Sequence, residues 1–186
     1  MQRRQIARFA AALPLLAAAP LLTPAPAQAA TRTEIDADVA AALTRLRGME
    51  NAAPLFRSAQ AVLIFPRIVS GGFIVGGQYG EGALMRGTAT TGYYNIAGLS
   101  FGFLAGAQAA GLAMFFMTAE SLRALMSADG WEIGTGPTVV ALDRGLQANA
   151  TSTTLTEPVY AITFGQQGLM AAVALNGTKI TRITPS

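Results

Sequence analysis

Residues 61–87 read AVLIFPRIVSGGFIVGGQYGEGALMRG, and residues 90–118 read TTGYYNIAGLSFGFLAGAQAAGLAMFFMT. In both, short apolar runs rich in aromatic and β-branched residues end at a glycine or a polar pair. This pattern is typical of consecutive antiparallel strands joined by tight turns. The stretch from Gln60 to Met117 therefore predicts an α+β fold. We expect a predominantly antiparallel, strongly curved or barrel-like β-sheet that carries a few short helices.

Glycine is unusually frequent inside these predicted strands. It gives up packing area there, so a sequence keeps it where a sheet bends or where a backbone or ligand approaches closely. From Ser100 to Gly106, alternation places Phe101, Phe103 and Ala105 on one face and Gly102, Leu104 and Gly106 on the other. We favour curvature as the role of these glycines; the alternative is a groove floor that admits an acyl chain or a head group.

The first 29 residues have the features of an export signal. Arg3, Arg4 and Arg8 precede an apolar segment from Phe9 to Leu22, and Ala27-Gln28-Ala29 forms an A-x-A cleavage site. We expect residues 1–29 to be removed, so that the mature protein begins at Ala30 and is periplasmic, either free or peripheral to a membrane. An uncleaved anchor is the weaker alternative, and the sequence leaves the Sec and Tat export routes both open.

Removal of this segment changes the charge balance. The chain has 13 Lys and Arg residues against 10 Asp and Glu, and loss of the three signal arginines leaves 10 of each. A formally neutral chain lacks the dense basic stripe of a nucleic-acid-binding surface, so we expect no nucleic-acid partner. The chain has no cysteine, which excludes disulfides and a lipid-modified cysteine. Residues 30–186 are long enough for one domain with its own core.

Helices are expected on either side of the strand-rich stretch. Residues Thr33 to Met49 carry apolar side chains at helical spacing, with Thr33 and Asp36 as an approximate capping box. We expect this amphipathic helix to pack on the sheet; the alternative is a helix that lies on a membrane. Shorter helices are predicted at Ala52–Ala59, capped by Asn51, and at Ala119–Ala128, capped by Thr118.

The C-terminal part is expected to add further strands to the sheet. Each of these segments is short, apolar and bounded by turn residues such as Asn176-Gly177. They are Trp131–Ile133, Thr138–Leu142, Leu146–Ala150, Val159–Phe164, Leu169–Leu175 and Lys179–Ile183.

The residues for catalysis are scarce. The chain has neither histidine nor cysteine, which excludes histidine-based triads, thiol chemistry and most transition-metal sites. The acids outside the predicted helices are far apart in sequence, and the single lysine, Lys179, has no S-x-x-K companion. The glycine clusters match neither phosphate-binding signature. We therefore predict a protein that is not an enzyme and that has no cofactor and no metal site.

Several blocks along the chain together resemble the SYLF domain family, from Thr33 to Ile183. They are Val62–Arg67, Gly76–Gly82, Gly92–Asn95, Phe101-Gly102, Gly106–Gln108, Met114–Thr118, Gly130–Glu132, Phe164–Met170 and Gly177–Ile180. The order of these blocks carries the resemblance, whereas any one glycine cluster would be unspecific.

The resemblance implies lipid binding without catalysis. Eukaryotic SYLF domains bind phosphoinositides and some bind actin, while bacterial members are exported proteins thought to bind lipid. In the eukaryotic members, lipid binding is attributed to an amphipathic N-terminal helix and a basic patch. The first basic position of that patch is kept here as Arg67, but the second, usually lysine, is Ser70. This departure argues against a phosphoinositide ligand.

A lipid-binding site would need an apolar pocket or groove for acyl chains and a cation near the phosphate. We predict that Arg67 follows a turn at Phe65-Pro66 and lies at the rim of the sheet, with Arg86 near the same rim. Tyrosines suit a head-group boundary because they join an apolar ring to a polar tip. The full set of predicted lipid-binding residues is Arg67, Arg86, Tyr79, Tyr93, Tyr94, Lys179 and Arg182. The alternative function is an envelope structural or protein-interaction module without a lipid ligand.

Overall fold

The computed structural model describes residues 29–72, 75–101, 108–142, 155–167, 175 and 177–186. Its helices are α1 (Arg32–Arg47), α2 (Ala53–Ser58), which follows a single 3-10 turn at Glu50–Ala52, and α3 (Ala119–Ser127). Its strands are β1 (Ala61–Gly72), β2 (Val75–Arg86), β3 (Ala89–Phe101), β4 (Gln108–Phe116), β5 (Trp131–Glu132), β6 (Val139–Leu142), β7 (Val159–Gln167) and β8 (Thr178–Ile183).

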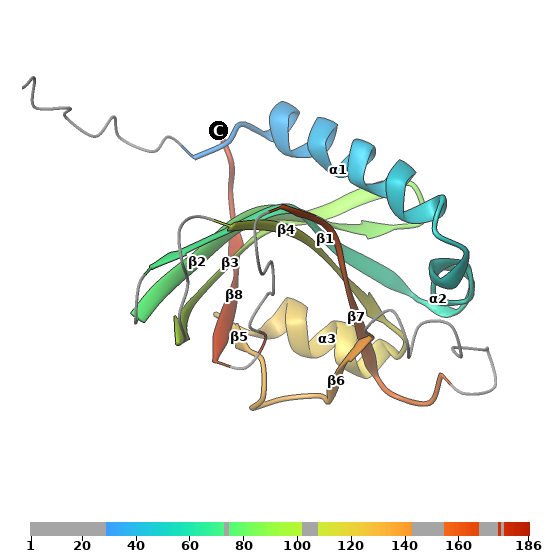
Figure 1. The fold of residues 1–186 in the computed structure, drawn as a ribbon. Coiled ribbons are helices and arrows are strands. Elements are labelled where there is room, and N and C mark those ends of the chain that lie inside the picture. The colour runs from blue at the N-terminus through green and yellow to red at the C-terminus, as the bar shows by residue number, and fades with distance from the viewer. Residues whose placement is uncertain (1–28, 73–74, 102–107, 143–154, 168–174, 176) are drawn as a thin grey trace, which may run out of the picture.

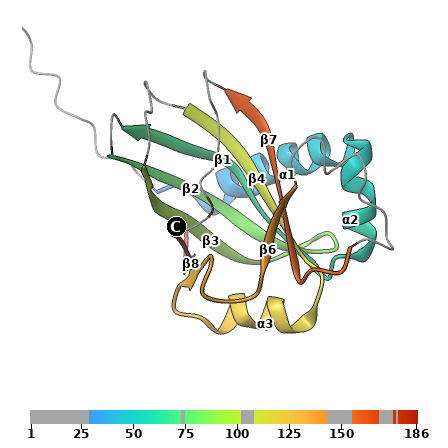
Figure 2. The same ribbon diagram turned by 60° about the horizontal axis from the view of Figure 1, so that its bottom comes forward.

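All of the described strands join one sheet in the order β5-β8-β3-β2-β1-β4-β7-β6. Neighbouring strands are antiparallel except β6 and β7, which are parallel. The sheet arches, with α1 over its convex face and α3 beneath its concave face (Figure 1). Seen from below, β1 lies between β2 and β4 at the middle of the arch (Figure 2). The predicted α+β class and strong curvature are confirmed, but the sheet is a half-barrel rather than a closed barrel.

The bend of the sheet is built around a bulge in β1. The register of β1 shifts between Ile64 and Arg67 against β2, and between Phe65 and Ile68 against β4. Our prediction of a turn at Phe65-Pro66 was therefore wrong, because the strand continues through these residues. A proline lacks the N–H that a regular ladder needs, and a bulge is one of the few places inside a sheet that accept it.

Two glycines of β2 let the bulge approach closely. A Cβ atom on Gly82 would collide with the carbonyl oxygen of Ile64, and one on Gly80 would lie 2.7 Å from the carbonyl oxygen of Arg67. Both obstacles are backbone atoms of β1, which cannot swing aside as a side chain can. At these two positions the glycines serve curvature, as predicted. The alternation predicted for Ser100–Gly106 falls largely outside the described residues.

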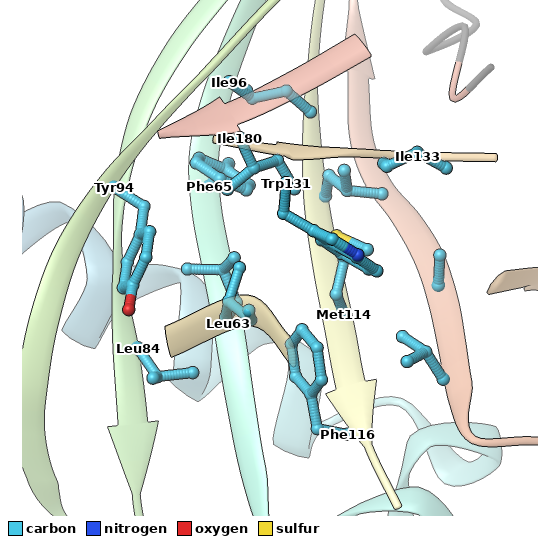
Figure 3. Packing of buried hydrophobic residues seen from close by; sticks show 14 of the residues in the cluster. Leu63, Phe65, Leu84, Tyr94, Ile96, Met114, Phe116, Trp131, Ile133 and Ile180 are labelled. Atoms are coloured by element: carbon cyan, nitrogen blue, oxygen red, sulfur yellow. The ribbon is translucent and has the colours of Figure 1, made fainter. Parts of the chain in front are cut away.

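Alternate residues of the central strands bury against two separate cores. The concave core gathers Leu63 and Phe65 of β1 with Leu122 of α3 and Trp131 of β5. Figure 3 shows the rings of Phe116 and Trp131 beside Met114, and the centroids of the two rings are 5.8 Å apart. The convex core packs the apolar face of α1 and α2 on the other side of the same strands. The amphipathic N-terminal helix therefore covers the sheet, as we expected.

Several element boundaries differ from the predictions. Helix α1 begins one residue earlier because its capping box is formed by Thr31 and Glu34, not by Thr33 and Asp36. Helix α2 begins at Ala53, so its N-cap position is Ala52 rather than Asn51. The cap of α3 at Thr118 is confirmed, since its side chain accepts a bond from the Ser121 N–H. The predicted strand Leu146–Ala150 and residues 169–174 of the predicted strand Leu169–Leu175 lie outside the described residues.

We expect Gly82→Ala to destabilise the fold by about 1–3 kcal/mol, because the added methyl group must push β2 away from the bulge. The measurement is chemical unfolding followed by the fluorescence of Trp131, the single tryptophan, which is buried. Gly71→Ala is the matched control, since a Cβ there would meet no atom within 4 Å. Its effect should stay within about 0.5 kcal/mol, as at other unconstrained sites. Equal stability of the two variants would contradict this account of the bulge.

Candidate functional site

A groove lies where the start of α1 passes over β1 and β2, and we call it the Arg67 groove. It encloses about 540 Å³. Its walls come from the segment before α1, from α1 itself and from the two central strands. The lining residues are Ala29, Ala30, Ile35, Asp38, Pro66, Arg67, Val69, Tyr79, Gly80 and Glu81. The bulge of β1 thus supplies both an apolar wall, Pro66, and a cation, Arg67.

Glu81 joins two walls of this groove through hydrogen bonds. Its two carboxylate oxygens accept hydrogen bonds from the Tyr79 hydroxyl, at 2.6 Å, and from the backbone N–H of Ala30, at 3.0 Å. Burial, together with the bond to Glu81, raises the pKa of the Tyr79 phenol. These contacts fix the position of the chain just before α1 relative to β2.

The open part of the Arg67 groove combines apolar surface with an unused cation. Val69 and Tyr79 are large apolar side chains that remain 42% and 48% exposed. Arg67 is also exposed, and it makes neither an ion pair nor a hydrogen bond with another side chain among the described residues. An incoming anion would therefore not have to break an existing pair, although the carboxylates of Asp38 and Glu81 lie in the same groove.

A second, more polar cleft of about 360 Å³ lies where β3 begins and β8 ends, and we call it the Arg182 cleft. It brings Arg32 of α1 near Arg182 of β8 and Tyr93 of β3. The Arg32 side chain donates to the carbonyl oxygen of Pro185, at 3.2 Å, and the Tyr93 hydroxyl donates to Asp36, at 2.9 Å. Burial and this bond to Asp36 raise the pKa of Tyr93.

A third pocket of about 430 Å³ lies between the end of α1, α2 and the β2–β3 hairpin. Arg47 and Arg57 line it together with Phe56 and Met85. The Arg47 guanidinium lies 6.0 Å from the centroid of the Phe56 ring, at the outer limit of a cation–π contact. We did not predict either arginine as a site residue. The only signal was their position in the last turns of two helices, where cations also favour the helix ends without any ligand.

The predicted site residues are distributed over several places. Arg67 and Tyr79 share the Arg67 groove, and Tyr93 and Arg182 share the Arg182 cleft. Arg86 does not lie beside Arg67, since Arg67 pairs with Glu81 and Arg86 is five residues further along β2, or about 17 Å away.

Two further predicted residues have other surroundings. Tyr94 is only 2% exposed and belongs to the concave core, where burial raises its pKa; Figure 3 shows its ring near Leu63 and Leu84. It cannot meet a head group at the surface. The Lys179 side chain packs over Gly130, next to β5, and lines neither the Arg67 groove nor the Arg182 cleft.

Ser70, the position at which the SYLF resemblance implies a second cation, is buried here. Ser70 is 5% exposed and pairs in register with Gln78 on β2 and Gln108 on β4. The Gln108 side-chain oxygen is also buried, without a hydrogen-bond partner among the described residues. Three uncharged polar side chains thus form a row across the sheet. Arg67 is accordingly the one cation of the predicted patch that the chain keeps.

Metal sites and membrane-spanning helices are two further features to consider. Within the described ranges, no group of three or more acids lies close enough together to hold a metal ion. None of the helices in those ranges has the length and apolar character that a membrane crossing requires.

Comparison with known protein families finds a match to the C-terminal part of the chain. Residues 97–184, from β3 to the end of β8, match the family model Ysc84, described as "Las17-binding protein actin regulator". This family carries the SYLF domain and is a family of binding domains. No curated protein matches the chain.

Glu34, at the start of α1 beside the Arg67 groove, makes a pH-dependent contribution to the stability of the fold. Its carboxylate accepts bonds from the Thr31 backbone N–H and hydroxyl, both at 2.8 Å, and these bonds lower the pKa of Glu34. A lowered pKa contributes stability that is present above the ordinary value of 4.5 and is lost as the pH falls through the folded value.

We therefore expect Glu34→Gln to be less stable than wild type at pH 7, and the difference to close between about pH 5 and pH 3. Glutamine keeps an acceptor at this position, so the comparison isolates the charge. Denaturant unfolding at a series of pH values is the measurement. Glu50→Gln serves as the control, because that exposed side chain has no hydrogen bond to any residue that the structure describes. A difference that persists unchanged at pH 3 would show that charge is not the cause.

Proposed function

The match over residues 97–184 makes this chain a SYLF domain protein, and on this premise we propose that it is a non-catalytic lipid-binding protein of the bacterial periplasm. Its ligand is a phospholipid, with the phosphate held by Arg67 and part of an acyl chain held by the apolar wall of the Arg67 groove. The export features of residues 1–29 support the compartment. The absence of histidine and cysteine from the sequence supports a role without catalysis.

The observation that carries this proposal is the composition of the Arg67 groove. Val69 and Tyr79 leave apolar surface uncovered at the same place where Arg67 has no partner among the described residues. Each methylene group of an acyl chain that leaves water for such a surface contributes about 0.8 kcal/mol. A guanidinium adds charge-assisted hydrogen bonds to phosphate. Tyr79 joins the two parts, because its ring is apolar and its hydroxyl is already oriented by Glu81.

The Arg182 cleft and the pocket at Arg57 support contact with a lipid surface more weakly. Each holds two arginines, but the Arg182 cleft is lined mainly by polar side chains, and the two sites lie at opposite ends of α1. Neither combines exposed large apolar side chains with an unpartnered cation in the way that the Arg67 groove does.

The family description names binding to a protein, and an envelope protein-interaction module is the second candidate. Native mass spectrometry of protein purified from the envelope separates the two. A bound lipid mass supports our proposal, whereas a stable protein partner without any lipid supports the interaction module.

We expect Arg67→Ala to weaken binding to vesicles that contain anionic phospholipid by about three- to tenfold, the equivalent of one screened guanidinium–phosphate contact. The measurement is co-sedimentation at two salt concentrations, and the effect should shrink at the higher one. Arg86→Ala is the matched control, since it removes the same charge from an exposed position at the other end of β2. Equal losses in the two variants would mean that general charge, not the groove, binds the vesicle.

The compartment is tested separately. Protein recovered from the periplasm of an expressing bacterium should begin at Ala30, because the A-x-A site ends at Ala29. N-terminal sequencing gives the answer directly. An intact Met1 on membrane-bound material would mean that the segment is retained as an anchor and that the periplasmic proposal is wrong.

A further inference from the structure

The backbone nitrogen of Ala30 lies 3.0 Å from the Oε2 atom of Glu81. Ala30 is also the residue that follows the predicted cleavage site. In the uncleaved chain this nitrogen is an amide that donates one neutral N–H. Cleavage would change its chemistry without requiring it to move.

We infer that the α-ammonium group released at Ala30 forms an ion pair with Glu81, and that this pair completes the Arg67 groove. The inference rests on the proposed export and processing of the chain. Hydrolysis of the Ala29–Ala30 peptide bond consumes one water and leaves a carboxylate on Ala29 and, at neutral pH, an ammonium on Ala30. The bond to Glu81 then becomes a charge-assisted one, which is stronger than the neutral bond that it replaces.

The position of this nitrogen is held from both sides. Thr31, the next residue, donates its own N–H to Glu34 in the capping box, which fixes the start of α1. Glu81 is held in turn by the Tyr79 hydroxyl on its other oxygen. A chain terminus usually loses conformational freedom when it pairs, but here the neighbouring bonds have already ordered it.

Processing also changes the charge of the groove. In the uncleaved chain one cation, Arg67, faces the carboxylates of Asp38 and Glu81. The ammonium group adds a second cation, so the charges of the processed groove balance. A cleft on the other side of Ala30 is lined by Glu34, which is held by Thr31, and by Ser186, whose α-carboxylate is a further negative charge near the ammonium group. Departure of Ala29, which lines the groove, leaves more of the groove open to a ligand.

The processed chain retains the structure that the inference needs. Every described helix and strand lies after Ala30, so residues 30–186 contain the whole described fold. A chain that begins at Ala30 can therefore be compared with one that begins at Pro24, in which Ala30 is an ordinary amide and the terminal charge is six residues away.

The first test compares the unfolding of these two chains by denaturant, with Trp131 fluorescence as the signal. Near pH 7 the chain that begins at Ala30 should have an unfolding constant about three- to tenfold smaller. The ordinary pKa of an α-amino group is about 7.7–8.0, and pairing raises it in the folded state. The advantage should therefore be fully present below pH 7.5 and be lost as the pH rises through the folded value.

Glu81→Gln should abolish the difference between the two chains, since it leaves an acceptor without a charge. Asp38→Asn, which removes a carboxylate of the same groove that is not bonded to Ala30, should preserve it. Equal stability of the two wild-type chains from pH 7 to pH 10 would overturn the inference. A difference that survives in Glu81→Gln would overturn it as well.

Vesicle binding provides the second readout and keeps the two proposals apart. The chain that begins at Ala30 should bind anionic vesicles several-fold more tightly than the chain that begins at Pro24. If neither chain binds lipid while the stability difference is present, the proposed function fails and the ion pair stands. If both chains bind lipid equally and show equal stability, the ion pair fails and the proposed function stands.

Discussion

The close approach of β1 to Gly80 and Gly82 is the constraint on which the rest of the structure depends. The bulge at Pro66 adds a residue to the middle strand and bends the sheet, and only glycine on β2 leaves room for it. The bend creates a concave side deep enough for α3 and Trp131 and a convex side on which α1 lies. Both cores therefore depend on one local irregularity in a single strand.

The same irregularity produces the candidate site. In a regular strand a residue at the middle of the sheet, under a covering helix, would be buried. The added residue instead places Arg67 and Pro66 where α1 begins, and leaves Arg67 exposed while Ile68 returns to the concave core. A cation in a central strand thus reaches solvent without desolvation, and a groove forms beside it. The fold and the site have a common origin in the chain.

The sequence predicted the helices and strands better than it predicted which residues lie next to one another in space. The period of Ile35, Val39, Ala42 and Leu46 identified α1 and its buried face, because amphipathic spacing is a local property. The bulge was mistaken for a turn, since Phe-Pro after an apolar run suits either structure. Tyr94 was expected at a surface and is buried, because strand alternation does not reveal which face is covered. Arg86 was wrongly placed near Arg67, because strand register depends on tertiary pairing, which the sequence does not show. Arg47 and Arg57 were missed as site residues for the same reason.

The two outer strands of the sheet have a consequence for the protein in a crowded compartment. Strand β5 has two residues and β6 has four, whereas the central strands β1 to β3 have twelve or thirteen. Long strands at an open edge offer unpaired backbone groups on which another chain can assemble. In the part of the chain that the structure describes, the long, glycine-rich strands lie inside the sheet, and the two outer strands offer few such groups for intermolecular β-pairing. Short outer strands of this kind disfavour the growth of an open sheet into an aggregate.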